Sequence, residues 1–258
     1  MRVQLPSFGL LGQRVCNLDL PRMGDLVALA EHDSTEVSYK YEVIKRLTDA
    51  DFTKITWCDV EFLYALAVSV LSNGVLDLEV TCNHCGTSNR ITLLFSDLTI
   101  EDLRGKNIFH TFKFKGNRYN FRLPSAQQIM ECFDIAKYED NVSVTFEHCK
   151  VACIMYGRPE EWESTLNLTV GEYTSALLFD KQLYHGFVYE SDMTCKKCNA
   201  STSFRFRMPE YLSDIDMNAV LEVMCRLNNA SITLQDAMSM TLNNFNKMID
   251  ICNKQMEE

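Results

Sequence analysis

Two pairs of cysteines share a spacing suited to metal binding. Cys82 and Cys85 lie in the segment TCNHCG, and Cys195 and Cys198 lie in TCKKCN. A Cys-x-x-Cys turn presents two thiolates to one ion, so two such turns that face each other complete a four-sulfur zinc site. The sequence therefore predicts that these four cysteines bind one structural zinc ion per chain.

Strand-like segments flank both pairs. VLDLEVT and NRITLLF surround the first pair, and FVYESDM and TSFRFRM surround the second. Their alternation of apolar and polar residues predicts two β-hairpins. Between the pairs lie 109 residues, whereas compact zinc ribbons have about 15–20. Loop-closure entropy grows only logarithmically with length, so a ribbon with a long insertion is expected.

Other interpretations of the cysteine pairs remain open. The two turns could be unrelated and bind no metal. A thioredoxin-like redox motif needs its Cys-x-x-Cys at the start of a helix, whereas strands follow these pairs. A catalytic zinc needs an open coordination position, and four thiolates leave none. His84 lies inside the first pair, where we expect it to be exposed, although it could replace a cysteine as ligand.

Composition restricts the functional classes. The chain has 258 residues, of which 47% are hydrophobic, and a net charge of −10. This charge disfavours a broad nucleic-acid surface. Arg205 and Arg207 nevertheless alternate with aromatic residues, and Lys196 and Lys197 lie in the second pair. A zinc-ribbon adaptor that binds nucleic acid is therefore the alternative function.

The number of cysteines and the start of the chain indicate in which cellular compartment the protein is expected. The eleven cysteines are an odd number, and no apolar signal segment follows Met1. We therefore expect reduced thiols and a protein that stays where it is made. No apolar stretch reaches the about 18 residues of a membrane span. Seven cysteines are expected to be ordinary buried residues: Cys16, Cys58, Cys132, Cys149, Cys153, Cys225 and Cys252.

The spacing of apolar residues predicts an α+β fold: a helical body with antiparallel hairpins that form a zinc ribbon interrupted by a long insertion. A hairpin is expected at residues 108–123, and Asp59 is expected to be the N-cap of its helix. Helices are expected at residues 20–32, 36–47, 59–73, 125–138, 142–156, 170–185, 214–227 and from 233 onward. The expected regions are an N-terminal arm and helices (1–74), strands with the first zinc knuckle (75–123), an inserted helical region (124–186), the second knuckle hairpin (187–209) and C-terminal helices (210–258).

The last expected helix has an apolar seam whose members are three or four residues apart. Such a seam either docks on the helix's own domain or binds a partner or a second copy of the chain. Its members are Met238, Leu242, Phe245, Ile249, Cys252 and Met256. The sequence lacks the P-loop, G-x-G-x-x-G, H-E-x-x-H and G-x-S-x-G motifs, so we expect no enzyme.

Several N-terminal motifs occur in a recognisable order. LPSFG at residues 5–9 is followed by LPRMGDL at 20–26, by WCDVEFLY at 57–64 and by the first Cys-x-x-Cys-Gly turn. Up to about Leu123 the chain resembles the baseplate hub and hub-assembly proteins of T-even-like contractile-tailed phages. The resemblance implies a non-enzymatic role as a hub component or as an assembly factor (a chaperone). It also implies other hub or tail proteins as partners, in the bacterial host cytoplasm or in the virion baseplate.

Overall fold

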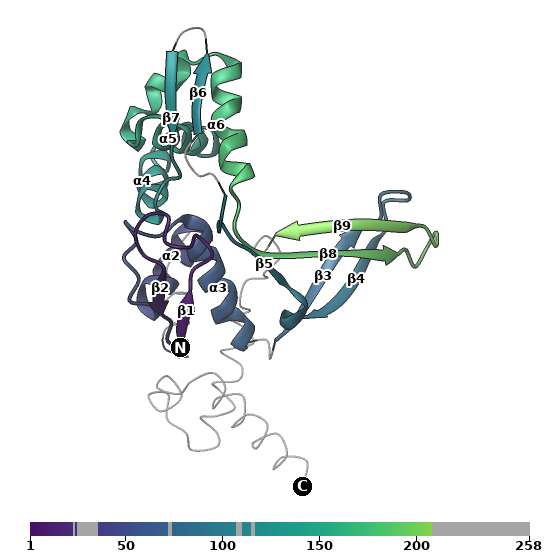
Figure 1. The fold of residues 1–258 in the computed structure, drawn as a ribbon. Helices are drawn as coiled ribbons and strands as arrows, with labels where there is room; N and C mark the ends of the chain where they lie inside the picture. Colours follow the sequence, from purple (N-terminus) through teal and green to yellow (C-terminus); the bar gives the residue numbers. More distant parts are fainter. Residues whose placement is uncertain (23, 25–35, 72–73, 107–109, 115–116, 208–258) are drawn as a thin grey trace.

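The computed structural model describes residues 1–22, 24, 36–71, 74–106, 110–114 and 117–207. These residues form an α+β structure with antiparallel strand pairs, which confirms the predicted fold class. Figure 1 shows an N-terminal body at the lower left, a second group of helices above it and two long β-hairpins that project to the right. We call the paired hairpins the arm, a name that does not refer to the N-terminal arm expected at the start of the chain. The predicted division into five regions stays a prediction.

The N-terminal body combines a small strand pair with two helices. Strand β1 (Arg2–Gln4) pairs antiparallel with β2 (Val15–Asn17), two short strands that the sequence did not predict. Helix α2 (Glu36–Leu47) has the predicted bounds. Helix α3 (Trp57–Leu71) is apolar on nearly every face, which is typical of a helix surrounded by other elements.

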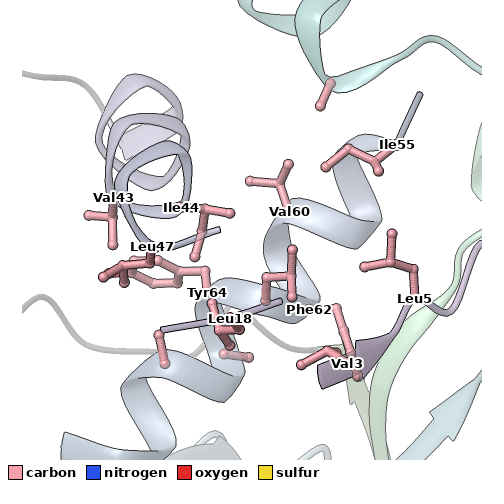
Figure 2. Packing of buried hydrophobic residues seen from close by; sticks show 14 of the residues in the cluster. Val3, Leu5, Leu18, Val43, Ile44, Leu47, Ile55, Val60, Phe62 and Tyr64 are labelled. Carbon is pink, nitrogen blue, oxygen red and sulfur yellow. The ribbon is translucent and has the colours of Figure 1, made fainter. Parts of the chain in front are cut away.

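The main hydrophobic core lies inside this body. Figure 2 shows side chains from separate segments converging there, among them Leu5, Leu18, Ile44, Ile55 and Val60. All five side chains are fully buried. Burying such a side chain contributes roughly 1.5–3 kcal/mol, so this core is the main source of the body's stability.

The start of α3 differs from the prediction. Asp59 is not the N-cap but lies in the first turn, and Thr56 precedes the helix. The backbone N–H of Asp59 donates to Thr56 Oγ1 at 3.2 Å, and Oδ2 of Asp59 accepts from the Thr56 N–H at 2.9 Å. This reciprocal pair is a capping box. Oδ1 of Asp59 accepts from the backbone N–H of Ser7 at 3.0 Å, so the carboxylate also anchors the N-terminal segment.

A buried histidine connects the cap of α3 to the strand that leads into the arm. Nε2 of His185 lies 2.5 Å from Thr56 Oγ1, and Nδ1 lies 2.7 Å from the Leu183 carbonyl oxygen. A carbonyl oxygen only accepts, so Nδ1 carries a proton. Burial is the main cause that lowers the pKa of His185, and the charge of Asp59 opposes it. Burial therefore favours the neutral form of His185 at this position.

The second group of elements is the inserted region. A strand pair packs with helices there: β6 (His110–Phe114), β7 (Asn117–Phe121), α4 (Ala126–Ala136), α5 (Val142–Tyr156), the 3-10 segment η2 (Pro159–Asn167) and α6 (Val170–Gln182). Ser125 and Gln128 form the predicted capping box of α4. Gly157 ends α5 with a φ of 81°, a conformation that favours glycine. Helix α6 ends three residues before the predicted residue 185.

The arm consists of two hairpins of similar design. Strands β3 (Val75–Thr81) and β4 (Ser88–Leu94) pair along their whole length. Strand β8 (Gly186–Thr194) pairs with β9 (Ser201–Arg207) on one side. On its other side β8 pairs with a short unpredicted strand, β5 (Thr99–Glu101), which follows the 3-10 turn η1 (Phe95–Asp97). The hairpins therefore connect to the helices at one end and project freely at the other (Figure 1).

Some predictions fall outside the described residues. They include most of the helix at 20–32, the turn of the hairpin at 108–123, the helix at 214–227 and the C-terminal seam. Within the described part of the chain, no helix combines the length and the apolar character that a membrane crossing needs.

Candidate metal centre

The first cysteine pair occupies the turn between β3 and β4. The Cys82 N–H donates to the Thr87 carbonyl at 2.9 Å, and the Gly86 N–H donates to the Cys82 carbonyl at 2.9 Å. Gly86 has a φ of 69°, which glycine adopts without strain. This backbone path turns the chain within a few residues, so the thiols of Cys82 and Cys85 can face the same side.

The second pair repeats this turn between β8 and β9. The Cys195 N–H donates to the Ala200 carbonyl at 3.0 Å, and the Asn199 N–H donates to the Cys195 carbonyl at 3.0 Å. Asn199 has a φ of 56° and takes the place that Gly86 has in the first turn. Asparagine tolerates this left-handed conformation better than most other non-glycine residues. The two turns are therefore structurally equivalent although their middle residues differ.

The four thiols meet at the free end of the arm. Sγ of Cys82 lies 3.7 Å from that of Cys198, and Sγ of Cys85 lies 3.6 Å from that of Cys195. All four sulfur atoms lie within 4.8 Å of one another. A tetrahedral site with Zn–S bonds of about 2.3 Å requires S···S distances of about 3.8 Å, whereas a disulfide requires about 2.05 Å. The spacing therefore fits four ligands around one metal ion.

Exposure is uneven within this cluster, which we call the clasp. Cys82 and Cys195 are buried, Cys85 is half-buried and Cys198 is exposed. Within the part of the chain that the structure describes, the clasp is the one group of three or more Cys, His, Asp or Glu residues with such closely spaced ligand atoms. It could hold one metal ion.

Backbone N–H groups stabilise the anionic form of the first cysteine in each pair. The N–H of Cys198 is the main group that lowers the pKa of Cys195, to about 6. The N–H of His84 is likewise the main group that lowers the pKa of Cys82. The thiolate is the form that binds metal, so the turns favour the metal-binding state of these two residues.

Two buried polar residues hold the hairpins together next to the clasp. Asn89 of the first hairpin accepts the Lys196 N–H on Oδ1 at 3.0 Å and donates from Nδ2 to Cys195 Sγ at 3.7 Å. Thr202 of the second hairpin lies with Oγ1 3.8 Å from Cys82 Sγ. Asn89 and Thr202 are 3% and 4% exposed. Each hairpin therefore contributes one polar side chain to the other hairpin's turn.

Sequence reasoning missed both residues, although a signal existed. Asn89 and Thr202 each stand seven positions after the first cysteine of their pair. This shared position indicates a side chain on the inner face of each hairpin. Its role could be recognised only once the two hairpins were known to face each other.

The other sequence candidates are not among the ligand atoms of the clasp. His84 is exposed as predicted, and its ring is not among the clustered ligand atoms. Arg205 forms an ion pair with Glu101. The guanidinium of Arg207 lies 4.3 Å from the ring centroid of Tyr184.

Of the seven cysteines predicted to be buried, five lie within the described residues and four of these are buried, whereas Cys225 and Cys252 lie outside the described residues. Cys132, Cys149 and Cys153 are fully buried and form one small cluster between α4 and α5. Cys16 is buried as well. Cys58 differs, because it is only partly buried and lines a cavity.

Comparison of the chain with protein-family models, with curated proteins and with solved structures gives no significant match.

Proposed function

We propose that the clasp holds one structural zinc ion and that the chain is a non-enzymatic assembly protein. The observation that carries the zinc assignment is the four-sulfur cluster with near-tetrahedral S···S distances. Four thiolates around a small divalent ion are a common structural zinc site in proteins. The ion would compensate the negative charge that four adjacent thiolates bring together.

A bound ion would cross-link two distant parts of the chain and so close a loop of the chain between them. It would join positions 82 and 85 to positions 195 and 198, and the helical insertion would lie inside that loop. Cross-linking distant positions removes conformational entropy from the unfolded chain, by an amount that depends only weakly on loop length. The ion would also fix the free end of the arm, because a structural site contributes its binding energy to folding.

The site chemistry supports a binding role over a catalytic one. A catalytic zinc keeps one coordination position for water or substrate, whereas four cysteines fill a tetrahedral ion. We assign the arm to contacts with other proteins, since it projects away from the helices (Figure 1). A structural ion at its free end would keep that end in a single conformation.

The particular assembly that we propose is the baseplate hub of a contractile-tailed phage. Support comes from the N-terminal motifs of the resemblance, two of which contact each other. Ser7 of the LPSFG segment donates its N–H to Asp59 of the WCDVEFLY helix at 3.0 Å. The chain would act as a hub component or as an assembly factor in the bacterial host cytoplasm, where thiols stay reduced.

The alternative is a zinc-ribbon adaptor for nucleic acid. It is favoured by Lys196 and Lys197, which are exposed at the free end of the arm. It is disfavoured at Arg205, which is paired with Glu101. A phosphate would have to displace this carboxylate, so the assembly role is the better supported function.

The test is co-purification of the tagged full-length chain from phage-infected cells, with and without nuclease. The assembly role predicts that tail proteins co-purify after nuclease treatment and that a Lys196→Glu/Lys197→Glu variant retains them. Binding to a labelled DNA duplex should be weak at about 150 mM salt for both chains. Nuclease-sensitive capture, together with DNA binding that falls steeply with salt and is lost in the variant, would instead establish the nucleic-acid adaptor.

A further inference from the structure

A cavity of about 680 Å³ lies where the N-terminal body, the inserted helices and the base of the arm meet. Trp57 and Cys58 of α3, Lys150 of α5, Lys181 of α6 and Arg207 of β9 are among the residues that line it. Pockets for small organic ligands have volumes of about 300–1,000 Å³. The cavity is therefore large enough for a molecule of that class, and it lies far along the arm from the clasp.

Most of the lining is apolar. Side chains from five different segments contribute to it, and they include Leu123, Pro124, Ile129, Phe146, Leu177 and Leu183. The ring of Trp57 adds a partly exposed aromatic surface. An occupant gains free energy here by burying hydrocarbon or aromatic surface, so its body must be apolar.

Two of the three acidic side chains of the lining have partners. Asp180 forms an ion pair with Lys150, whose Nζ lies 2.6 Å from Oδ2. Glu61 accepts the indole N–H of Trp57 at 3.0 Å. The third, Glu147, lies near Tyr173 of α6, where burial first and then the charge of Glu147 raise the pKa of the tyrosine hydroxyl. The contacts of Asp180 and Glu61 occupy these two carboxylates and also use the ammonium of Lys150.

Two cationic side chains at one edge of the cavity, Lys181 and Arg207, are not used in the contacts of the acidic side chains. Nη2 of Arg207 donates to the Lys181 carbonyl oxygen at 3.4 Å, which brings the two residues side by side. The guanidinium lies over the ring of Tyr184. Among the ion pairs in the described part of the chain, none involves Lys181 or Arg207. This edge of the cavity is therefore complementary to a negative group.

We propose that this cavity binds an amphipathic organic anion, a small molecule with an apolar body and one carboxylate, sulfonate or phosphate group. The apolar part of this ligand lies against the apolar lining between α3 and α6. The anionic group lies at the edge, where Lys181 and Arg207 stabilise it. The site is independent of the clasp and does not depend on the assembly role.

The first test is a fluorescence titration of the zinc-loaded, full-length chain with 8-anilinonaphthalene-1-sulfonate, which has an aromatic body and a sulfonate. We expect one strong site per chain. Thr174→Trp places a ring at an exposed position of the lining and should abolish that site. Lys181→Glu should weaken it about fivefold to tenfold. Lys113→Glu, the same charge change at an exposed position outside the lining, should leave it unchanged.

The second test uses Cys58 as a reporter inside the cavity. Burial raises the pKa of its thiol, so alkylation by N-ethylmaleimide is slow and can be followed by peptide mass spectrometry. Decanoate should slow the reaction at Cys58 at least threefold, and decanol should slow it less because it lacks the negative group. Dye binding that survives both Thr174→Trp and Lys181→Glu, or alkylation that decanoate leaves unchanged, would overturn the proposal.

Discussion

Buried apolar side chains are unequally divided between the N-terminal body and the arm. Among the described side chains of helix α3, six are buried apolar ones: Val60, Phe62, Leu63, Tyr64, Ala65 and Ala67. Among the described side chains of the hairpins, Leu78 and Leu93 are buried in the first, and Phe187, Val188 and Met193 in the second. At the free end of the arm the buried residues are cysteines, Asn89 and Thr202. The body is thus stabilised by a hydrophobic core, and the end of the arm depends on polar contacts and on its clasp.

This difference implies two responses to perturbation. Regions with few buried apolar contacts open with a smaller free energy than core elements do. A change in the core of the body should lower global stability without affecting the clasp. A change at the clasp should loosen the end of the arm first. Variants in each region can separate these effects.

The largest expected effect is in the body. Leu63 is fully buried in α3, and a Leu→Ala change in a core costs about 2–5 kcal/mol. Leu63→Ala should therefore lower the urea midpoint, measured by far-ultraviolet circular dichroism, while the folded protein keeps its metal content. Loss of metal from folded Leu63→Ala would show that body and clasp are not separable.

A smaller effect is expected next to the clasp. Asn89→Ala removes the contacts to the Lys196 N–H and to Cys195 Sγ. Loss of such supporting contacts typically weakens metal binding 10–100-fold, which is about 1.4–2.7 kcal/mol. Competition with a chromophoric chelator measures this change. Asn120→Ala, at an exposed position in β7, is the control, and equal affinities for the two variants would contradict the role of Asn89.

The smallest expected effect is a pH dependence at the junction of the body and β8. Burial, as the main cause, lowers the pKa of His185, so the folded state binds a proton less readily than the unfolded state, whose histidine pKa is about 6.5. The free energy of unfolding therefore has its full value, as far as His185 is concerned, above pH 6.5. It decreases as the pH falls below that value, by at most about 1.4 kcal/mol per pH unit. Urea unfolding between pH 7 and pH 5 should show this slope, and His185→Asn should reduce it. An identical slope in the variant would assign the pH dependence to other groups.

Local patterns predicted the parts of the fold that local chemistry determines. The bounds of α2 and α5 and the capping box of α4 follow from helical spacing and end signals. The two cysteine pairs and their flanking strands predicted the hairpins, and the equal spacing predicted that they meet.

Features that depend on distant segments could not be predicted in the same way. Asp59 was expected to be an N-cap, but it lies in the first turn of α3 and accepts the N–H of Ser7, 52 positions away. The roles of Asn89 and Thr202 arise from contacts between hairpins more than 100 positions apart. Cys58 resembles other cysteines in an apolar context, and only the packing of α5, α6 and the end of β9 around it creates the cavity.

The most direct test of the central claim is the metal content of the full-length chain purified without added metal. It should be measured by mass spectrometry beside Cys195→Ser and beside Cys58→Ser, which removes one thiol outside the clasp. The account predicts about one zinc per chain in the original protein and in Cys58→Ser, and none in Cys195→Ser. Absence of zinc from the original protein, or its retention in Cys195→Ser, would contradict a single ion shared by the two hairpins.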